Sequence, residues 1–266
     1  AGMRAQTGKE IGRPLGSPVV LSPWSQILLS PKQLFELPTP SISKISASTV
    51  VGPNAKKPLT LDTPIMITAM SYGGSLSLRM KIALAKGAAM AGTSTNTGES
   101  TVTDEERNAA KYLFGQYNRG GWLTEAEKLR RLDAIEVQLG QGAWGGAVES
   151  TKQAATMEEH LRKAWHLNED QDATIHARMP GVQTSGDIID LVKNLKRTYE
   201  VPVGIKIAGS DYIEYELEVA ALAGVDFLTV DGSEGGTAIA PVTLEDDVGL
   251  PTLYSIVRAV DWLEEN

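Results

Sequence analysis

The sequence predicts an α/β fold of the TIM (β/α)8-barrel type, with about six of the eight strand–helix units present. Three observations lead to this prediction. Short apolar runs alternate with amphipathic segments from residue 64 onward, and unusual polar residues stand where several of these runs end. No Gly-x-Gly-x-x-Gly fingerprint follows the first run, although an open doubly wound sheet that binds a dinucleotide would require one.

The chain divides into two predicted parts. Residues 1–60 are rich in Pro, Ser and Gly and show no sustained period, so we expect an irregular N-terminal arm with short strands near 44–51. Residues 61–266 carry the alternating pattern and are expected to form the partial barrel. A polar stretch at about 100–133 is predicted to be an insertion with a function or small helices of its own, because structureless connections of that length are uncommon.

The first two thirds of the barrel region contain four runs that predict strands, at 65–70, 92–95, 135–139 and 173–177. The first run is continuously apolar, as expected for a strand that is covered on both faces. Between the first two runs, apolar residues recur at helical spacing from Leu76 to Ala91, which predicts a helix.

The last third has the clearest pattern. Ser185 is predicted to cap a helix that precedes a strand at 203–207, and a second strand is predicted at 225–230. Between these strands, Asp211 and Glu214 resemble a capping box.

Two helices are predicted around that last strand. Gly224 is expected to end the helix before it, and Pro251 suits the first turn of the helix after it. The final helix carries an apolar stripe that consists of Leu253, Ile256, Val257, Val260 and Leu263.

Composition excludes several classes of function. A formal charge of -8 argues against nucleic acid as a partner, because phosphate binding needs clustered Lys and Arg. The absence of cysteine excludes disulfides, a thiol nucleophile and any iron–sulfur cluster ligated by this segment, and no metal site is predicted. No apolar run is long enough to span a membrane, and no signal peptide is evident, which favours the cytoplasm.

Residues that could take part in binding or catalysis gather where the apolar runs end. In chain order they are Met70, Ser71, Tyr72, Gly73 and Gly74; Asn96 and Glu99; Gln138 and Gln141; His176 and Arg178; Lys206; and Asp231, Gly235, Gly236 and Thr237. The carboxyl ends of barrel strands meet at one mouth, where glycines allow a planar ligand to approach the backbone. A buried Lys206 needs a negative partner, and a reduced flavin is one such partner.

Each residue also has a simpler interpretation. Gly235 and Gly236 alone are typical of an ordinary loop, and Lys206 alone could point outward or pair with a structural carboxylate. His176 alone is typical of a core or loop histidine, and Asn96 and Gln141 could cap backbone groups. The aromatic residues Tyr112, Phe114, Tyr117 and Trp122 are interpreted as packing within the insertion. Only the joint placement at strand ends favours a site.

Five segments, in order and at matching spacing, resemble the FMN-binding synthase domain of the glutamate synthase family, in its short bacterial and archaeal form. They are 64–76, which is similar to the Met-Ser-x-Gly-x-x-Ser loop; 94–99, similar to Ser-Asn-Thr-Gly-Glu; 135–143, similar to an apolar strand into Gln-Gly-Ala; 204–207, similar to Val-Lys-Leu; and 230–241, similar to Gly-x-x-Gly-Gly-Thr-Gly-Ala-x-Pro. The lead-in at 51–58 resembles the same short relatives.

The resemblance implies a barrel that holds FMN over its C-terminal face. In complete glutamate synthases this barrel reduces the iminium formed from 2-oxoglutarate and ammonia. Electrons arrive from an iron–sulfur cluster, and ammonia arrives by a tunnel from a separate amidotransferase domain. The implied partners are therefore an ammonia-supplying amidotransferase and a ferredoxin-like or NAD(P)H-oxidising electron donor. The cluster itself would lie outside this cysteine-free segment.

The resemblance also assigns roles to residues of this chain. Those expected to lie against the flavin are Met70, Ser71, Tyr72, Asn96, Gln138 and Lys206, and those expected to shape the phosphate and substrate side are Asp231, Gly235, Gly236 and Thr237. Lys206 would stabilise the reduced flavin electrostatically. Glu99 is the candidate for proton transfer, and Gln141 and Arg178 are the substrate candidates.

Two departures from the family pattern weaken the expectation of 2-oxoglutarate as substrate. Trp144, Gly145 and Gly146 stand where the family has Lys-Pro-Gly-x-Gly-Gly, and Gln138 replaces a second lysine. A non-catalytic barrel that binds a ligand or serves as a scaffold is therefore an alternative, because fold alone does not determine function. A third alternative, another FMN barrel such as an isomerase or hydroxy-acid oxidase, shares the Gly-Gly-Thr loop but lacks the Ser-Asn-Thr-Gly-Glu segment.

The sequence stops before the last two predicted units of the barrel. In such barrels these units commonly provide phosphate-binding loops. By itself, this segment is therefore expected to bind FMN weakly or not at all and to associate through open sheet edges.

Overall fold

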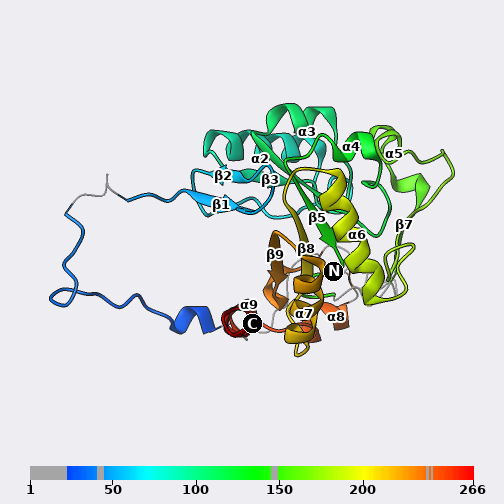
Figure 1. Cartoon of the computed structure of the whole chain (residues 1–266). Helices are drawn as coiled ribbons and strands as arrows, with labels where there is room; N and C mark the ends of the chain where they lie inside the picture. Colours follow the sequence, from blue (N-terminus) through cyan, green and yellow to red (C-terminus); the bar gives the residue numbers. More distant parts are fainter. Residues whose placement is uncertain (1–22, 41–44, 145–148, 238–239, 241) are drawn as a thin grey trace, which may run out of the picture.

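A parallel sheet of five strands forms the centre of the molecule (Figure 1). The computed structural model describes residues 23–40, 45–144, 149–237, 240 and 242–266. In spatial order the strands are β3 (Ser94–Asn96), β4 (Tyr112–Tyr117), β5 (Ala134–Gln138), β8 (Val203–Ala208) and β9 (Phe227–Asp231). Helices pack against the strands and against one another, as the predicted α/β barrel-type fold requires.

Two short antiparallel hairpins lie outside this sheet. They are β1 (Thr49–Val51) with β2 (Leu59–Leu61), and β6 (Ser150–Lys152) with β7 (Ala173–Ile175). The α-helices are α2 (Leu78–Met90), α3 (Asp104–Ala109), α4 (Ala126–Leu129), α5 (Glu159–Ala164), α6 (Ser185–Thr198), α7 (Ile213–Ala223), α8 (Val242–Asp247) and α9 (Thr252–Glu265). Three 3-10 helices complete the described elements, namely η1 (Pro23–Gln26), η3 (Ala154–Thr156) and η4 (Ser233–Gly235). No helix in this described part of the chain is both long and apolar enough to cross a membrane.

The two faces of the sheet differ in chemistry. On β5, Ile135 and Val137 join the main hydrophobic core, which also contains Ile205 of β8 and residues of α6 and α7. Successive side chains of a strand point to opposite faces, so Glu136 and Gln138 lie on the other face. Both are buried all the same. The interior of the curled sheet is therefore polar, and the helices cover its apolar face.

The N-terminal hairpin closes one end of the sheet. Leu59 of β2 packs against Phe114 and Ala134, near the starts of β4 and β5. Gly52, with a φ of +63°, lies so close to the chain before β8 that an added Cβ would be 2.7 Å from the Cβ of Pro202. Only a glycine allows this approach without strain. The hairpin does not cover the carboxyl ends of the strands, which lie at the opposite side of the sheet and are available to form a site.

The strand predictions need three corrections. The run at 65–70 is not a regular strand; it lies beside β3, where the Ile67 amide donates to the Ser94 carbonyl at 3.0 Å. Strand β4 was missed, because it lies inside the polar stretch at 100–133 that was predicted to be an insertion. The run at 173–177 is not a barrel strand, since β7 pairs with β6 in the outer hairpin.

Two predicted helix caps are also corrected. Thr184, rather than Ser185, caps α6; its hydroxyl accepts from the Asp187 amide while the Asp187 carboxylate accepts from the Thr184 amide. Asp211 does not cap α7, whose N-cap residue is Tyr212. Instead, Asp211 pairs with Arg258 of α9 at 3.0 Å.

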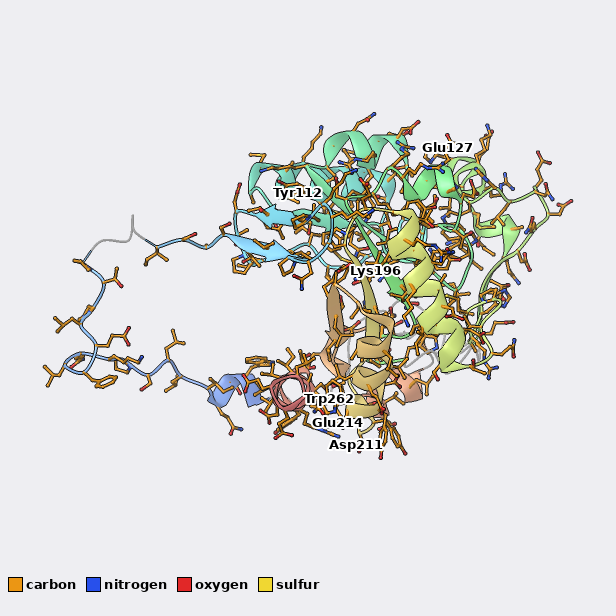
Figure 2. All side chains as sticks on the ribbon, viewed as in Figure 1. Tyr112, Glu127, Lys196, Asp211, Glu214 and Trp262 are labelled. Atoms are coloured by element: carbon orange, nitrogen blue, oxygen red, sulfur yellow. The ribbon has the colours of Figure 1, made fainter. Side chains whose placement is uncertain are left out.

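The helix α7 ends as predicted, with Gly224 in the left-handed conformation at a φ of +69°. Helix α9 was predicted to have Pro251 in its first turn; it begins one residue later, and Pro251 is its N-cap residue. Its orientation is unexpected, however, because Ser255 and Ala259 are buried whereas the stripe residues Ile256, Val257, Val260 and Leu263 are 40–56% exposed. The reason is that α9 packs on α7 through its other side, where Arg258 also pairs with Glu214 at 2.8 Å. Figure 2 labels Asp211, Glu214 and Trp262 in this region.

Candidate functional site

A cavity of about 870 Å³ opens at the carboxyl ends of the strands. Eleven of the strand-end residues singled out from the sequence line it, namely Met70, Ser71, Gly73, Gly74, Glu99, Gln141, Lys206, Asp231, Gly235, Gly236 and Thr237. They come from the ends of different strands and from the loops that follow. The last residues of parallel strands lie at one edge of a sheet. Residues that are distant in sequence can therefore form one wall of the cavity. The volume is in the range of small-molecule sites.

Lys206 and Asp231 form an ion pair in this wall. They lie on the neighbouring strands β8 and β9, and Lys206 Nζ is 3.0 Å from Asp231 Oδ2. Lys206 is only 4% exposed. The negative partner that a buried lysine needs is therefore supplied by the protein itself.

Close backbone packing fixes this part of the wall. A Cβ added to Gly235 would lie 2.1 Å from Asp231 Oδ1, so any larger residue there would displace the carboxylate that pairs with Lys206. On the other side, Gly98 has a φ of +65°, and an added Cβ would lie 2.5 Å from the Ser71 nitrogen. The loop after β3 and the loop at 71–74 are thereby held against each other.

Glu99 is buried beside an arginine that the sequence analysis did not single out. Arg119 Nη2 lies 3.3 Å from Glu99 Oε1, and Arg119 Nε donates to Gln138 Oε1 at 3.1 Å. The guanidinium also lies over the Trp144 ring, 4.9 Å from its centroid. Burial raises the pKa of Glu99 above its ordinary value, although Arg119 and Lys206 oppose that rise. Arg119 follows β4, so missing that strand meant missing this residue.

The raised pKa of Glu99 gives a testable pH dependence of stability. In the folded protein Glu99 holds its proton to a higher pH than in the unfolded chain, so the folded state binds more protons between the ordinary value of 4.5 and the raised value. The free energy of unfolding should therefore fall as the pH rises through that window. In the Glu99→Gln variant this contribution should be absent. Urea unfolding of both proteins at a series of pH values checks the point, and parallel pH profiles would contradict it.

A buried carboxylate organises the polar interior behind the cavity. Glu136 Oε1 accepts from Gln116 Nε2 at 2.7 Å and from Asn96 Nδ2 at 3.2 Å, while its Oε2 accepts from Thr229 Oγ1 at 2.6 Å. Asn96 is thus held inside the sheet and does not line the cavity; its Oδ1 accepts from the Gly98 amide at 2.9 Å and orders the turn before Glu99. Gln116, on the missed strand β4, does line the cavity.

The other predicted site residues lie outside the wall. Tyr72 is buried, with its hydroxyl 3.0 Å from His160 Nδ1, and burial together with Glu158 raises the Tyr72 pKa to about 12. Gln138 is fully buried, and its Nε2 has no partner among the described residues. Arg178 lines a separate cavity of about 440 Å³ at the start of α6. Gly145, Gly146, Ala238, Ile239 and Pro241 lie outside the described residues.

The segment at 150–175 forms a second wall that the sequence analysis missed. The rings of Trp122 and Trp165 stack with centroids 3.7 Å apart and planes inclined by 5°, and Trp165 Nε1 donates to Ser100 Oγ at 2.9 Å. From the outer hairpin, Lys152 Nζ donates to the Gly73 carbonyl at 2.9 Å. Strands of three residues are too short for alternation to reveal them. Trp122, interpreted as packing, both packs and lines the cavity.

Comparison with solved structures identifies the fold. A mandelate oxidase mutant solved with benzaldehyde matches with a TM-score of 0.52 and 13% sequence identity, over 84% of this chain and 60% of that chain. At this identity the likeness concerns the fold alone. It agrees with the arrangement of parallel strands and outer helices described above.

Comparison with curated relatives identifies the family. The chain is 36% identical over 227 residues to a glutamate synthase large subunit-like protein of Rhizobium meliloti, covering 84% of this chain and 50% of the relative. It is 32% identical over 259 residues to an archaeal glutamate synthase [NADPH] of Methanocaldococcus jannaschii, covering 93% and 48%. The chain thus spans about half the length of these relatives. The model of the conserved region in glutamate synthase matches residues 34–266, and the chain therefore belongs to the glutamate synthase family.

Proposed function

We propose that this chain is the flavin-binding part of an FMN-dependent oxidoreductase of the glutamate synthase type. The reaction would be the reduction of an imine formed from a 2-oxo acid and ammonia. One observation carries the proposal: Lys206, a buried cation near the carboxyl end of β8, lies in the wall of a cavity that strand-end residues line together. Membership of the family supports the same function.

The residues of the cavity fit FMN chemically. Ser71, Gln116, Gln141 and Thr237 offer hydroxyl and amide groups that can hydrogen-bond the polar edge of a flavin. The loop that carries Ser71 is closely packed, since a Cβ at Gly74 would lie 2.2 Å from Ser71 Oγ. When bound, FMN supplies the hydride transfer that amino-acid side chains cannot perform.

Two side chains of this chain are proposed to act in the reaction. Lys206 would place its positive charge near the negative charge that develops on a reduced flavin, and Asp231 would hold the ammonium group in position. Glu99 would act as a proton donor, because a carboxyl group with a raised pKa keeps its proton to higher pH. Arg119 would orient that carboxyl group.

The partners follow from the same proposal. Relatives named glutamate synthase [NADPH] support an NADPH-oxidising electron donor, and a ferredoxin-like donor is the alternative. Ammonia would come from an amidotransferase. Any iron–sulfur cluster in the electron path would be held outside this segment, which contains no cysteine.

Purification of the full-length protein tests the proposal. We expect visible absorbance of oxidised flavin in the purified protein, and release of FMN on heating. After anaerobic reduction, the flavin should be reoxidised by a 2-oxo acid together with ammonium, but by neither compound alone. A correctly folded full-length protein that neither contains nor takes up flavin would contradict the proposal.

A second candidate function is a non-catalytic barrel that binds a ligand or serves as a scaffold. The observation that favours it is the buried Trp144. This residue stands where the family pattern has a lysine, and its ring packs on Arg119. In that case the flavin, if bound, should never be reoxidised by an imine of any 2-oxo acid tested.

A further inference from the structure

The charges in the wall of the main cavity are unequally compensated. Four ionisable side chains line it: Glu99, Lys152, Lys206 and Asp231. Lys206 pairs with Asp231 at 3.0 Å, and Glu99 pairs with Arg119 behind the wall at 3.3 Å. For Lys152, the described residues provide a hydrogen bond to a carbonyl oxygen but no ion pair. Among the described residues of this wall, Lys152 is therefore the cation that does not pair with a carboxylate.

The position of Lys152 is fixed by its surroundings. It is the last residue of β6, and its Nζ donates to the Gly73 carbonyl at 2.9 Å. That carbonyl is itself constrained, because Gly73 has a φ of +86° and an added Cβ would lie 2.3 Å from Leu161 Cδ2. The acid nearest along the hairpin, Asp172, is engaged by the Ala154 amide at 2.8 Å.

An ammonium group has three N–H donors, and the contact with Gly73 uses one of them. Two donors and a full charge remain at the junction of the hairpin and the strand-end loops, beside the cavity. A partly enclosed cation in that state attracts an anionic oxygen group, because charge-assisted hydrogen bonds are stronger than neutral ones. Lys206 already has one carboxylate partner, Asp231, whereas Lys152 has none among the described residues.

We propose that Lys152 binds the anionic group of the ligand in this cavity, either the carboxylate of a 2-oxo acid or the phosphate of the flavin. The inference rests on the proposed function for the identity of the ligand, and it adds the residue that would recognise its charge. Because one uncompensated cation stands in the described wall, this side of the cavity suits a single carboxylate rather than two. Pyruvate is therefore a better probe than 2-oxoglutarate.

The test uses the full-length protein and the variants Lys152→Gln and Lys152→Arg, with Lys163→Gln as control. Lys163 is an exposed lysine of α5 that pairs with Glu159 and lies outside the cavity wall. Calorimetric titrations with FMN, riboflavin, pyruvate and inorganic phosphate give the four affinities. Unfolding midpoints and circular dichroism confirm that each variant is folded.

The two sources of the anionic group predict different results. If Lys152 holds the phosphate, Lys152→Gln should weaken FMN binding about 10- to 100-fold and leave riboflavin binding unchanged, which corresponds to the loss of one charge-assisted contact. If it holds the carboxylate, the same loss should appear for pyruvate instead. In both cases Lys152→Arg should retain most of the affinity, since it keeps the charge.

Unchanged affinities for all four probes in a folded Lys152→Gln protein would overturn the inference. So would an equal loss in Lys163→Gln. A wild-type protein that binds no flavin would contradict the proposed function instead. The pyruvate and phosphate titrations need no flavin, so they would still decide whether Lys152 binds an anion.

Discussion

Replacing Lys206 with methionine should lower the turnover of the full-length, flavin-loaded enzyme by about 10²- to 10³-fold, the usual cost of removing one preorganised electrostatic contact to a developing charge. Lys206 is the buried cation near the carboxyl end of β8, and methionine has a similar shape without the charge. Steady-state kinetics normalised to bound flavin give the turnover. The midpoint potential of the flavin should become more negative, because the reduced form loses its stabilisation.

The single variant also leaves Asp231 without its partner, which would destabilise the fold. The double variant Lys206→Met/Asp231→Asn separates the two effects. It should recover much of the unfolding free energy but not the turnover or the potential. If Lys206→Met kept both the wild-type potential and the wild-type turnover, Lys206 would have no role in the chemistry.

Replacing Lys81 with methionine should reduce the free energy of unfolding by about 3–5 kcal/mol, the typical cost of removing one partner of a buried ion pair. Lys81 of α2 is 1% exposed, and its Nζ lies 3.0 Å from Glu106 Oε1 of α3. It also donates to the carbonyls of Met70, at 2.8 Å, and Asn96. Burial lowers the pKa of Lys81 and raises that of Glu106, so each charge depends on the other.

Urea unfolding measures this cost. The double variant Lys81→Met/Glu106→Leu should recover most of it, because no buried charge then remains unpaired. As a matched control, Lys111→Met breaks the more exposed pair with Asp62 and should cost less than about 1 kcal/mol. Equal effects of Lys81→Met and Lys111→Met would show that the buried pair contributes no more to the free energy of unfolding than the exposed pair does.

The sequence predicted the strands that stand out as mainly apolar runs and missed β4, in which a glycine and a glutamine interrupt the run. Strands β5, β8 and β9 lie within one or two residues of their predicted positions. Strand β4 contains Gly115 and Gln116, and Gln116 is polar because it bonds Glu136 inside the sheet. That bond joins two strands, so no pattern within β4 alone could reveal it. The misassigned run at 173–177 shows the converse, since a short apolar run also suits a hairpin edge.

The sequence predicted the site residues whose position is set by the end of a strand. It did not predict where a side chain lies when a loop or a tertiary contact sets its direction. Lys206 and Asp231 reach the cavity because they lie near and at the carboxyl ends of neighbouring parallel strands. Tyr72 follows an apolar run too, yet its hydroxyl contacts His160 of α5 at 3.0 Å, and it does not line the cavity. Lys152 comes from a hairpin whose docking against Gly73 is a tertiary contact. Sequence spacing contains no information on such a contact.

The order of strands in the sheet also has a consequence for folding kinetics. Strands β3, β4 and β5 are neighbours in both sequence and space, whereas Ile135 of β5 pairs with Val203 of β8 across the entire hairpin segment and α6. Contacts between distant parts of a chain form slowly, because the loop-closure entropy is lost before the contact stabilises anything. We therefore expect the three-strand layer to assemble first as the chain leaves the ribosome. The cavity, whose wall needs Lys206, would then be the last part of the molecule to acquire its shape.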